Sequence, residues 1–347
     1  MSPDEPSAHL HHMFFTISCA ISKFQRLLLR YASSRAVFDM ENDLYAVPVQ
    51  FKNNRGETIE LNAVYQDTMP DGGEKAVIVA LHGAPGSHAD FKYLAPELKQ
   101  HGIRMVMPNF PGHGFTPNDR RVSCENDERN EFAQAILDSL ENVTANNLYF
   151  IGHSRGGENA LQMATSPRNI KKVRGVVLLN SAGLRVHRGI EPFWKIDYMI
   201  RLENLRIFNF IVHPFLYIVY NQLLGLRVPS GAAAAMALRP LCTFAFDRLL
   251  PCIDVINKNN QIRFLHAYSG NDFLIQPDIS KEFASKLERR VELECTVPDN
   301  NDITDRTIKA FSSGYQTVSV NFVNEGHFLQ KFRARYLIDV ILALIRI

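Results

Sequence analysis

Residues 148–158, LYFIGHSRGGE, predict a strand, a sharp turn and the first residues of a helix. The apolar run from Leu148 to Ile151 has the length of a buried strand, and residues 156–165 follow a helical pattern. Between them lies the motif G-x-S-x-G, in which Gly152 and Gly156 leave room for backbone that a side chain would displace. Ser154 is therefore expected in a strained conformation at the N-terminus of the helix.

Segments on both sides of this turn continue the alternation of strand and helix. Apolar runs at 76–81, 104–107, 148–151 and 173–179 predict strands, with helices expected near 90–100 and 128–141. A helix between consecutive strands makes the strands parallel and covers both faces of their sheet. Two earlier runs, 44–52 and 58–65, predict an antiparallel pair around a turn at 53–56. Strands at 262–268 and 318–323 and a helix from 328 to the end complete the pattern.

The segment 184–260 interrupts this alternation. It is rich in aromatic and aliphatic residues and holds several helical stretches, which predicts a helical cap inserted into a core formed by 44–183 and 261–347. Residues 207–226 carry no charge and are long enough for a transmembrane helix. A single span would place the two halves of one sheet on opposite sides of a bilayer. We therefore interpret this run as helices above a pocket, with contact at a membrane surface as the alternative.

Two polar residues follow later strands where they could serve Ser154. A serine hydroxyl is a weak nucleophile until a base takes its proton, and the base needs a third group to hold its tautomer. Asp272 follows the strand at 262–268, and His327 follows the strand at 318–323. The carboxyl ends of parallel strands meet at the edge of the sheet where ligands bind. The sequence thus predicts Ser154 as nucleophile, Asp272 as orienting acid and His327 as general base.

A glycine-rich turn offers donors for an oxyanion. Residues 82–87, HGAPGS, follow the strand at 76–81. The expected donors are the backbone N–H groups of Ala84 and of Arg155, the residue after the serine, each worth roughly 3 kcal/mol in the transition state. His113, in a second loop at 110–114, is interpreted as structural. The residues expected to support the two turns are His82, Gly83, Gly152 and Gly156.

These motifs resemble the α/β-hydrolase superfamily, in the branch with H-G-x-P-G at the oxyanion turn. The resemblance covers residue 44 to the C-terminus and implies an α/β-hydrolase fold, a mostly parallel eight-stranded sheet flanked by helices with an inserted helical cap. It implies the three catalytic roles given above, without a cofactor or a metal. Ser154 excludes the relatives that use an aspartate as nucleophile, such as epoxide hydrolases and haloalkane dehalogenases.

Two features depart from the family pattern. Asp272 and His327 lie further apart than one helix and one strand require, so 293–314 is expected to be an extra excursion. Its acidic residues, Asp299, Asp302 and Asp305, are interpreted as a solvated loop. Arg155 adds a cation beside the nucleophile, which would suit an anionic substrate group. The interpretation that we favour is an arginine at the surface or in a salt bridge.

Composition narrows the classes of partner and compartment. The 347 residues are 46% hydrophobic and 21% charged, as in ordinary globular proteins with one main core. A net charge of +2 gives no broad attraction for nucleic acid. The five cysteines lack C-x-x-C spacing, which argues against a disulfide framework or a zinc site and favours a reducing compartment such as the cytoplasm.

The N-terminal segment 1–43 precedes the core. Asp4 and Glu5 come before a short apolar run at 13–21, whereas a secretory signal has a basic start and a longer run. Residues 13–35 alternate apolar and basic residues, as a basic amphipathic helix does. We expect this helix to pack on its own domain, and peripheral contact with a membrane is the alternative.

The function expected from these residues is hydrolysis of an ester or related acyl bond through an acyl-enzyme on Ser154. Aromatic residues in the cap suit a small-molecule acyl substrate that is apolar or lipid-like. One alternative is a non-catalytic protein of this fold that binds a ligand or a partner. Another is a different reaction in the same site, such as carbon–carbon hydrolysis or acyl transfer.

Overall fold

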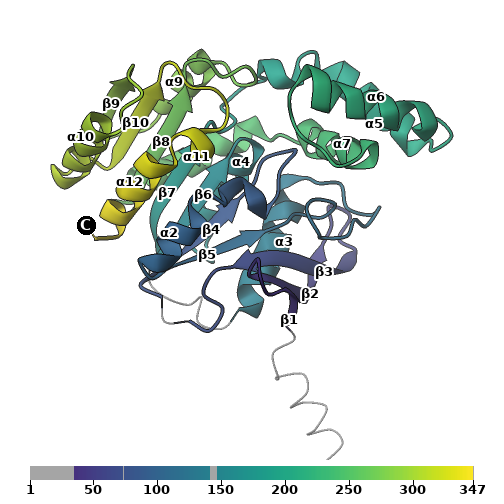
Figure 1. Ribbon diagram of the computed structural model, residues 1–347, viewed down its shortest axis with the longest axis horizontal. Helices are drawn as coiled ribbons and strands as arrows, with labels where there is room; N and C mark the ends of the chain where they lie inside the picture. The colour runs from purple at the N-terminus through teal and green to yellow at the C-terminus, as the bar shows by residue number, and fades with distance from the viewer. Residues whose placement is uncertain (1–34, 73, 141–146, 347) are drawn as a thin grey trace, which may run out of the picture.

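A ten-stranded sheet forms the centre of the protein (Figure 1). The computed structural model describes residues 35–72, 74–140 and 147–346. The strand order is β1-β2-β3-β5-β4-β6-β7-β8-β10-β9, in which β1, β2, β3 and β5 pair antiparallel and all other neighbours pair parallel. The strands are β1 (Ala36–Asp39), β2 (Leu44–Lys52), β3 (Thr58–Asp67), β4 (Ala76–Leu81), β5 (Ile103–Pro108), β6 (Leu148–His153), β7 (Val173–Leu179), β8 (Arg263–Ser269), β9 (Arg290–Cys295) and β10 (Thr317–Phe322).

Helices cover both faces of this sheet. Strand β4 shows why, because its side chains alternate between two separate apolar clusters: Val77, Val79 and Leu81 point to one face, and Ile78 points to the other. The first face packs against α3 (Asn126–Ser139), α4 (Arg155–Thr165), α8 (Leu249–Lys258) and α9 (Pro277–Ser285). The second face packs against η1 (His88–Phe91), α2 (Ala95–Gln100), α10 (Asn301–Ser312), α11 (Leu329–Phe332) and α12 (Ala334–Arg346).

The cap has a small apolar core of its own, centred on Val212, Leu216, Tyr220 and Leu238. Figure 1 shows α5, α6 and α7 gathered at one corner, apart from the helices that cover the sheet. The elements of the cap are η2 (Arg188–Ile190), α5 (Phe193–Asn204), α6 (Asn209–Ile218), the π-helical turn η3 (Val219–Leu223), α7 (Gly231–Leu238), η4 (Arg239–Cys242) and η5 (Phe246–Arg248). In the described part of the chain, no helix combines the length and the apolar character that crossing a membrane requires.

The expected architecture is confirmed, and four details differ from the sequence prediction. The sheet has two strands more than the expected eight, β1 and β9, and both lie at its edges. Strand β1 lies in the segment 1–43, which was expected to precede the core; the helix expected at 13–35 lies almost wholly outside the described residues. The segment 293–314 holds the end of β9 and the helix α10, so Asp302 and Asp305 are on a helix and not in a loop, although both are exposed. Helix α8, counted in the cap segment 184–260, packs its Ile253 and Ile256 into the core beneath the sheet.

Candidate active site

Ser154 lies between β6 and α4 with φ 53° and ψ −125°. This backbone conformation is strained for a residue with a side chain. It persists only where tightly packed surroundings hold the residue in place. The amide N–H of Ser154 donates to the carbonyl of Leu179 at 3.0 Å, and its carbonyl accepts from Gly157 and Ala182. The bonds with Leu179 and Ala182 hold the turn against the end of β7, which places Ser154 at the carboxyl edge of the sheet.

The glycines around this turn are required by close packing. A Cβ at Gly156 would lie 2.1 Å from the carbonyl oxygen of Leu81, and a Cβ at Gly152 would lie 2.4 Å from the Cα of Gly157. At Gly83, a Cβ would lie 3.0 Å from the Cβ of Ser154. The turn after β4 and the turn after β6 therefore pack directly on each other, and the room that Gly152 and Gly156 were expected to leave for backbone is needed.

Asp272 and His327 form a hydrogen-bonded pair. His327 Nδ1 donates to Asp272 Oδ2 at 2.7 Å, and both residues are buried. The other oxygen of Asp272 accepts the backbone N–H groups of Leu274 at 2.8 Å and Ile275 at 3.0 Å. Since Nδ1 carries a proton, Nε2 of a neutral His327 has a free lone pair that can accept a proton.

The pair is electrostatically suited to keep Asp272 charged and His327 neutral. Burial raises the pKa of Asp272, but the hydrogen bond and charge of His327 and two backbone amides outweigh it, so the pKa falls below its ordinary value. Burial lowers the pKa of His327, and Asp272 opposes this only in part. At neutral pH the site therefore holds a carboxylate beside an imidazole that is ready to act as a base.

Three residues that the sequence analysis did not single out hold the His327 loop. His153, next to the serine, donates from Nε2 to the carbonyl of His327 at 3.0 Å, and the two rings are 4.9 Å apart. Asn180 and Ser269 both donate to the carbonyl of Gly326, at 3.1 Å and 2.7 Å. These contacts join the ends of β6, β7 and β8 to the loop after β10, which brings His327 to the turn that carries Ser154.

Within the described residues, no hydrogen bond joins the Ser154 hydroxyl to His327. The structure thus brings Asp272 and His327 together and places Ser154 on the adjacent turn at the same edge of the sheet. Hydrogen bonds between nucleophile and base are often long without substrate and tighten when it binds.

One of the two expected oxyanion donors, Ala84, lies at the same cavity as Ser154. The N–H groups of Ala84 and Arg155 donate no hydrogen bond within the described part of the chain. His82 supports the turn from below: its Nε2 accepts the N–H of Phe110 at 3.1 Å, and its Nδ1 contacts the carbonyl of Gly83 at 2.7 Å. Burial lowers the pKa of His82 well below its ordinary value, so this ring is a neutral structural group.

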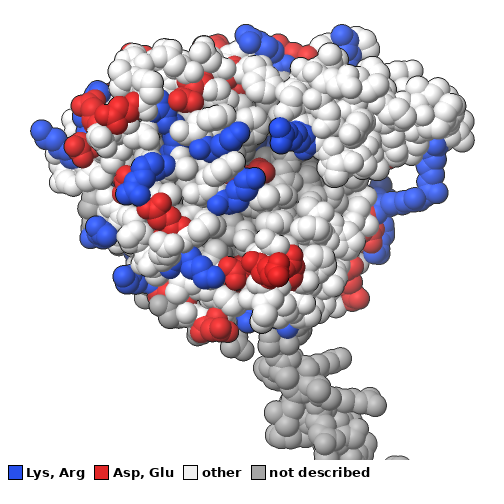
Figure 2. All heavy atoms as spheres, viewed as in Figure 1, with Lys and Arg blue, Asp and Glu red and all other residues white. Residues whose placement is uncertain are grey.

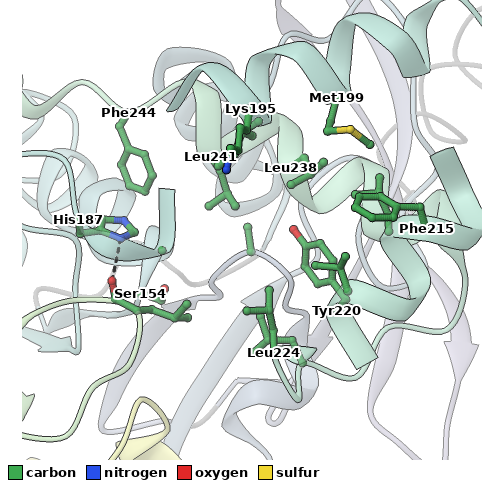
Figure 3. A pocket seen from close by; sticks show the side chains of 17 residues that line it. Ser154, His187, Lys195, Met199, Phe215, Tyr220, Leu224, Leu238, Leu241 and Phe244 are labelled. Atoms are coloured by element: carbon green, nitrogen blue, oxygen red, sulfur yellow. Dashed lines mark hydrogen bonds between the residues drawn. The ribbon is translucent and has the colours of Figure 1, made fainter. Parts of the chain in front are cut away.

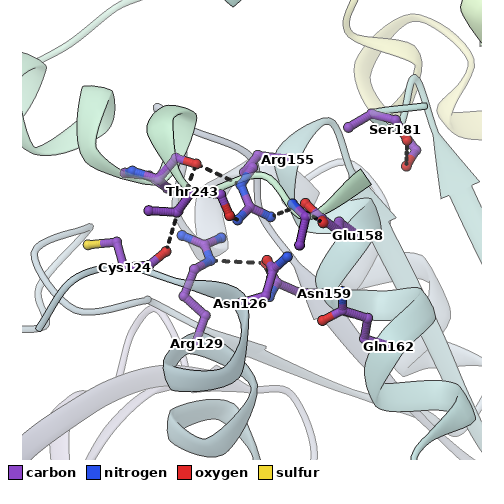
Figure 4. Close-up of polar contacts among 12 residues, drawn as sticks. Cys124, Asn126, Arg129, Arg155, Glu158, Asn159, Gln162, Ser181 and Thr243 are labelled. Atoms are coloured by element: carbon purple, nitrogen blue, oxygen red, sulfur yellow. Dashed lines mark hydrogen bonds and ion pairs between the residues drawn. The ribbon is translucent and has the colours of Figure 1, made fainter. Parts of the chain in front are cut away.

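Arg155 is not among the described residues that line the cavity, and the hydrogen bonds of its side chain join the cap to α4 (Figure 4). It donates to Glu158 at 2.8 Å, to the carbonyl of Pro240 at 2.8 Å and to the carbonyl of Thr243 at 3.1 Å. Its guanidinium also lies 4.5 Å from the centre of the Phe244 ring. Arg155 is therefore a buried salt-bridge residue, which is one of the two positions that the favoured interpretation allowed.

A cavity of about 210 Å³ lies between the core and the cap (Figure 3). Ser154 and His187 lie at one end, Ala84 also lines the cavity, and α5, α6, η3 and α7 supply most of the remaining wall. The wall is almost entirely apolar and includes Met199, Phe215, Leu216, Val219, Leu224, Leu226, Leu238 and Leu241. His187 was not predicted, because nothing in its local sequence shows that it lines the same cavity as Ser154.

The sheet carries a serine turn and an acid–histidine pair at its carboxyl edge. This arrangement is that of the α/β-hydrolase superfamily. The chain belongs to the family described as alpha/beta hydrolase of unknown function (DUF1057), whose model matches residues 41–346.

Relatives and solved structures agree with this assignment. The Caenorhabditis elegans protein F35H12.5, named as uncharacterized, is 36% identical over 315 residues, covering 88% of this chain and 87% of that protein. Phospholipase YtpA of Bacillus subtilis is 30% identical over 144 residues, covering 37% of this chain and 54% of that protein. The enol-lactonase of Burkholderia xenovorans LB400 has the same fold with a TM-score of 0.57 and 13% identity, covering 86% of this chain and 100% of its own. A thermophilic esterase of Thermogutta terrifontis also has a TM-score of 0.57, with 17% identity over 87% of this chain and 98% of its own.

Proposed function

We propose that this protein is a serine hydrolase that cleaves an ester or related acyl bond of an apolar substrate through an acyl-enzyme on Ser154. The observation that carries the proposal is the apolar cavity whose wall includes Ser154 and Ala84, next to the hydrogen-bonded pair of Asp272 and His327. The phospholipase name of the B. subtilis relative agrees with an acyl substrate.

The proposed reaction has two steps, acylation of Ser154 and hydrolysis of the acyl-enzyme, and His327 acts as base and then as acid in each. His327 Nε2 takes the hydroxyl proton while Ser154 Oγ attacks the acyl carbon, and the N–H groups of Ala84 and Arg155 stabilise the oxyanion. Collapse of the tetrahedral intermediate releases the alcohol, which receives the proton from His327. A water molecule then gives its proton to His327 and attacks the acyl-enzyme, and the same steps in reverse order release the acid and restore Ser154.

The wall of the cavity supports an apolar acyl chain. Among the described residues that line the cavity, only Lys195 is charged. A cavity of this kind favours substrates whose acyl chain is apolar. Each methylene moved from water into such a site contributes about 0.8 kcal/mol, or up to about fourfold in affinity.

We also propose that the substrate enters the cavity from a lipid surface. The exposed residues of the cap support this. Ile207, Phe210 and Leu223 are 71%, 76% and 74% exposed, and few charged residues mark the cap on the face that Figure 2 shows. Phe215 and Leu224 are exposed as well, and both line the wall of the cavity. Exposed apolar side chains that gather on one element mark interaction sites, and two of those in the cap also contact the proposed substrate site.

A fluorophosphonate probe tests the nucleophile, because it reacts covalently with an activated serine. We expect the full chain to be labelled, Ser154→Ala to remain unlabelled, and His327→Ala to be labelled about 10²- to 10⁴-fold more slowly. Ser285→Ala, which changes a serine on α9, serves as the matched control and should be labelled like the wild type. With p-nitrophenyl esters, kcat/KM should rise with chain length.

Two outcomes would reject parts of this proposal. Equal labelling of all four proteins would exclude Ser154 as the nucleophile, whereas an unlabelled but well-folded wild type would favour the ligand- or partner-binding alternative. A rate that does not depend on chain length would exclude an apolar acyl site.

A further inference from the structure

His187 is a buried polar group in the wall of the cavity, and the proposed mechanism does not use it. Its side chain lies at the Ser154 end of the cavity, where its ring meets the Phe244 ring edge-on at 5.4 Å (Figure 3). The residue is only 5% exposed, and its Nε2 has no hydrogen-bond partner within the described part of the chain. A buried polar atom without a partner costs about 1–3 kcal/mol, so its presence calls for a reason.

The contacts of the other ring nitrogen determine the tautomer. Nδ1 lies 3.1 Å from the carbonyl oxygen of Leu274, which can only accept a hydrogen bond, so Nδ1 carries the proton. Burial lowers the pKa of His187 to about 4, so the ring is neutral at neutral pH. Nε2 therefore presents a lone pair, and only a hydrogen-bond donor can satisfy it.

The loop that carries the proposed acid also fixes the position of His187. The carbonyl of Leu274 accepts from Gly189 at 2.9 Å as well as from His187, and the N–H of Leu274 donates to Asp272. Two consecutive hydrogen bonds, from His187 to Leu274 and from Leu274 to Asp272, thus connect the imidazole with the acid–histidine pair. A rigid acceptor at the Ser154 end of the cavity is suited to contact the substrate near the bond that reacts.

We propose that the substrate carries a hydroxyl group within a few bonds of its scissile ester, and that His187 Nε2 accepts a hydrogen bond from this hydroxyl. The inference rests on the proposed function and deepens it, because it makes the substrate a hydroxylated ester whose apolar part fills the rest of the cavity. His187 is then a specificity residue. A substrate without the hydroxyl leaves a buried acceptor unpaired, which sites of this kind discriminate against.

Matched pairs of esters test this inference. The alcohol side is probed with 2-hydroxyethyl octanoate against propyl octanoate, and the acyl side with p-nitrophenyl 2-hydroxyoctanoate against p-nitrophenyl octanoate. After correction for rates of base hydrolysis, we expect the wild type to prefer the hydroxylated member of one pair by about tenfold in kcat/KM. In His187→Phe the preference should disappear, so that the ratio of kcat/KM between the two members of the pair falls to about one.

His266→Phe is the matched control. His266 is a second buried histidine with an unpartnered ring nitrogen, but it packs against Tyr268 and Phe283 and does not line the cavity. Its replacement should leave the preference intact. Thermal melting checks that both variants fold; in His187→Phe the carbonyl of Leu274 still has its bond from Gly189.

A binding measurement separates this inference from the proposed function. Titration of the wild type and of His187→Phe with 1,2-octanediol and 1-octanol should show the diol bound about tenfold more tightly by the wild type alone. Failure to hydrolyse any of the four esters, with this binding difference present, would contradict the proposed function and leave the role of His187 standing. Equal binding of both alcohols, or the same ester preference in wild type and His187→Phe, would overturn the inference.

Discussion

At the scale of single residues, the pair of Asp272 and His327 makes the pH dependence of the proposed activity predictable. A general base works in its unprotonated form, so kcat/KM should fall at pH values below the pKa of His327. Because that pKa lies below its ordinary value of 6.5, the acid limb of the profile should lie below pH 6.5. A profile of kcat/KM against pH for a p-nitrophenyl ester measures it, and a limb above pH 6.5 would contradict the assignment.

Asp272→Asn should change this profile in a defined direction. The carboxylate raises the pKa of His327, so its neutral replacement should move the acid limb to still lower pH. The rate on the plateau should fall by about 10⁴-fold, as it does when an asparagine holds the wrong tautomer of a catalytic histidine. An acid limb that moves to higher pH would show that Asp272 is not the partner that sets the charge of His327.

The residues of the expected triad were predictable because each follows a strand that is visible in the sequence. Ser154 lies in a motif, and Asp272 and His327 follow strands whose carboxyl ends meet at one edge of the sheet. His153 and His187 could not be found in this way. Their contacts join segments that are far apart in the chain, and no local pattern records such tertiary contacts.

At the scale of secondary-structure elements, Arg155 and Glu158 connect α4 with the η4 region of the cap. Both side chains are buried, so Arg155→Met should leave an unpaired carboxylate and lower the free energy of unfolding by about 3–5 kcal/mol. The double change Arg155→Met with Glu158→Gln should cost less than the sum of the two single changes. Urea unfolding of the four proteins measures this coupling, and additive effects would contradict it.

The two edge strands show where sequence patterns are weak. Strand β9 alternates charged with apolar residues, and Val291 and Leu293 pack against one apolar cluster, so its alternation was a signal that could have been used. Strand β1 has only four residues, of which Val37 and Phe38 are exposed. A strand that pairs on one side needs little burial, so its sequence is under little constraint.

At the scale of the whole molecule, the mostly parallel sheet flanked by helices followed from the alternation of strand and helix. The limit of the cap did not, because α8 is helical and partly apolar like the cap helices. Only its packing of Leu249, Ile253 and Ile256 beneath the sheet distinguishes it from them. Helical periodicity indicates which face of a helix is buried but not which neighbour buries it.

The exposed face of the cap makes a prediction for the whole protein. If it docks on a lipid surface, the full chain should sediment with phospholipid vesicles, since each large side chain that leaves water contributes up to about 1.5–3 kcal/mol. The triple change Ile207→Ser, Phe210→Ser and Leu223→Ser should reduce vesicle binding by at least about tenfold. A control with the changes Val37→Ser, Met40→Ser and Phe332→Ser removes hydrophobic residues that are 57%, 76% and 57% exposed outside the cap, and should bind like the wild type. Equal loss in both triple variants would mean that general hydrophobicity and not the cap drives binding, and a wild type that stays in solution would exclude the lipid surface as the partner.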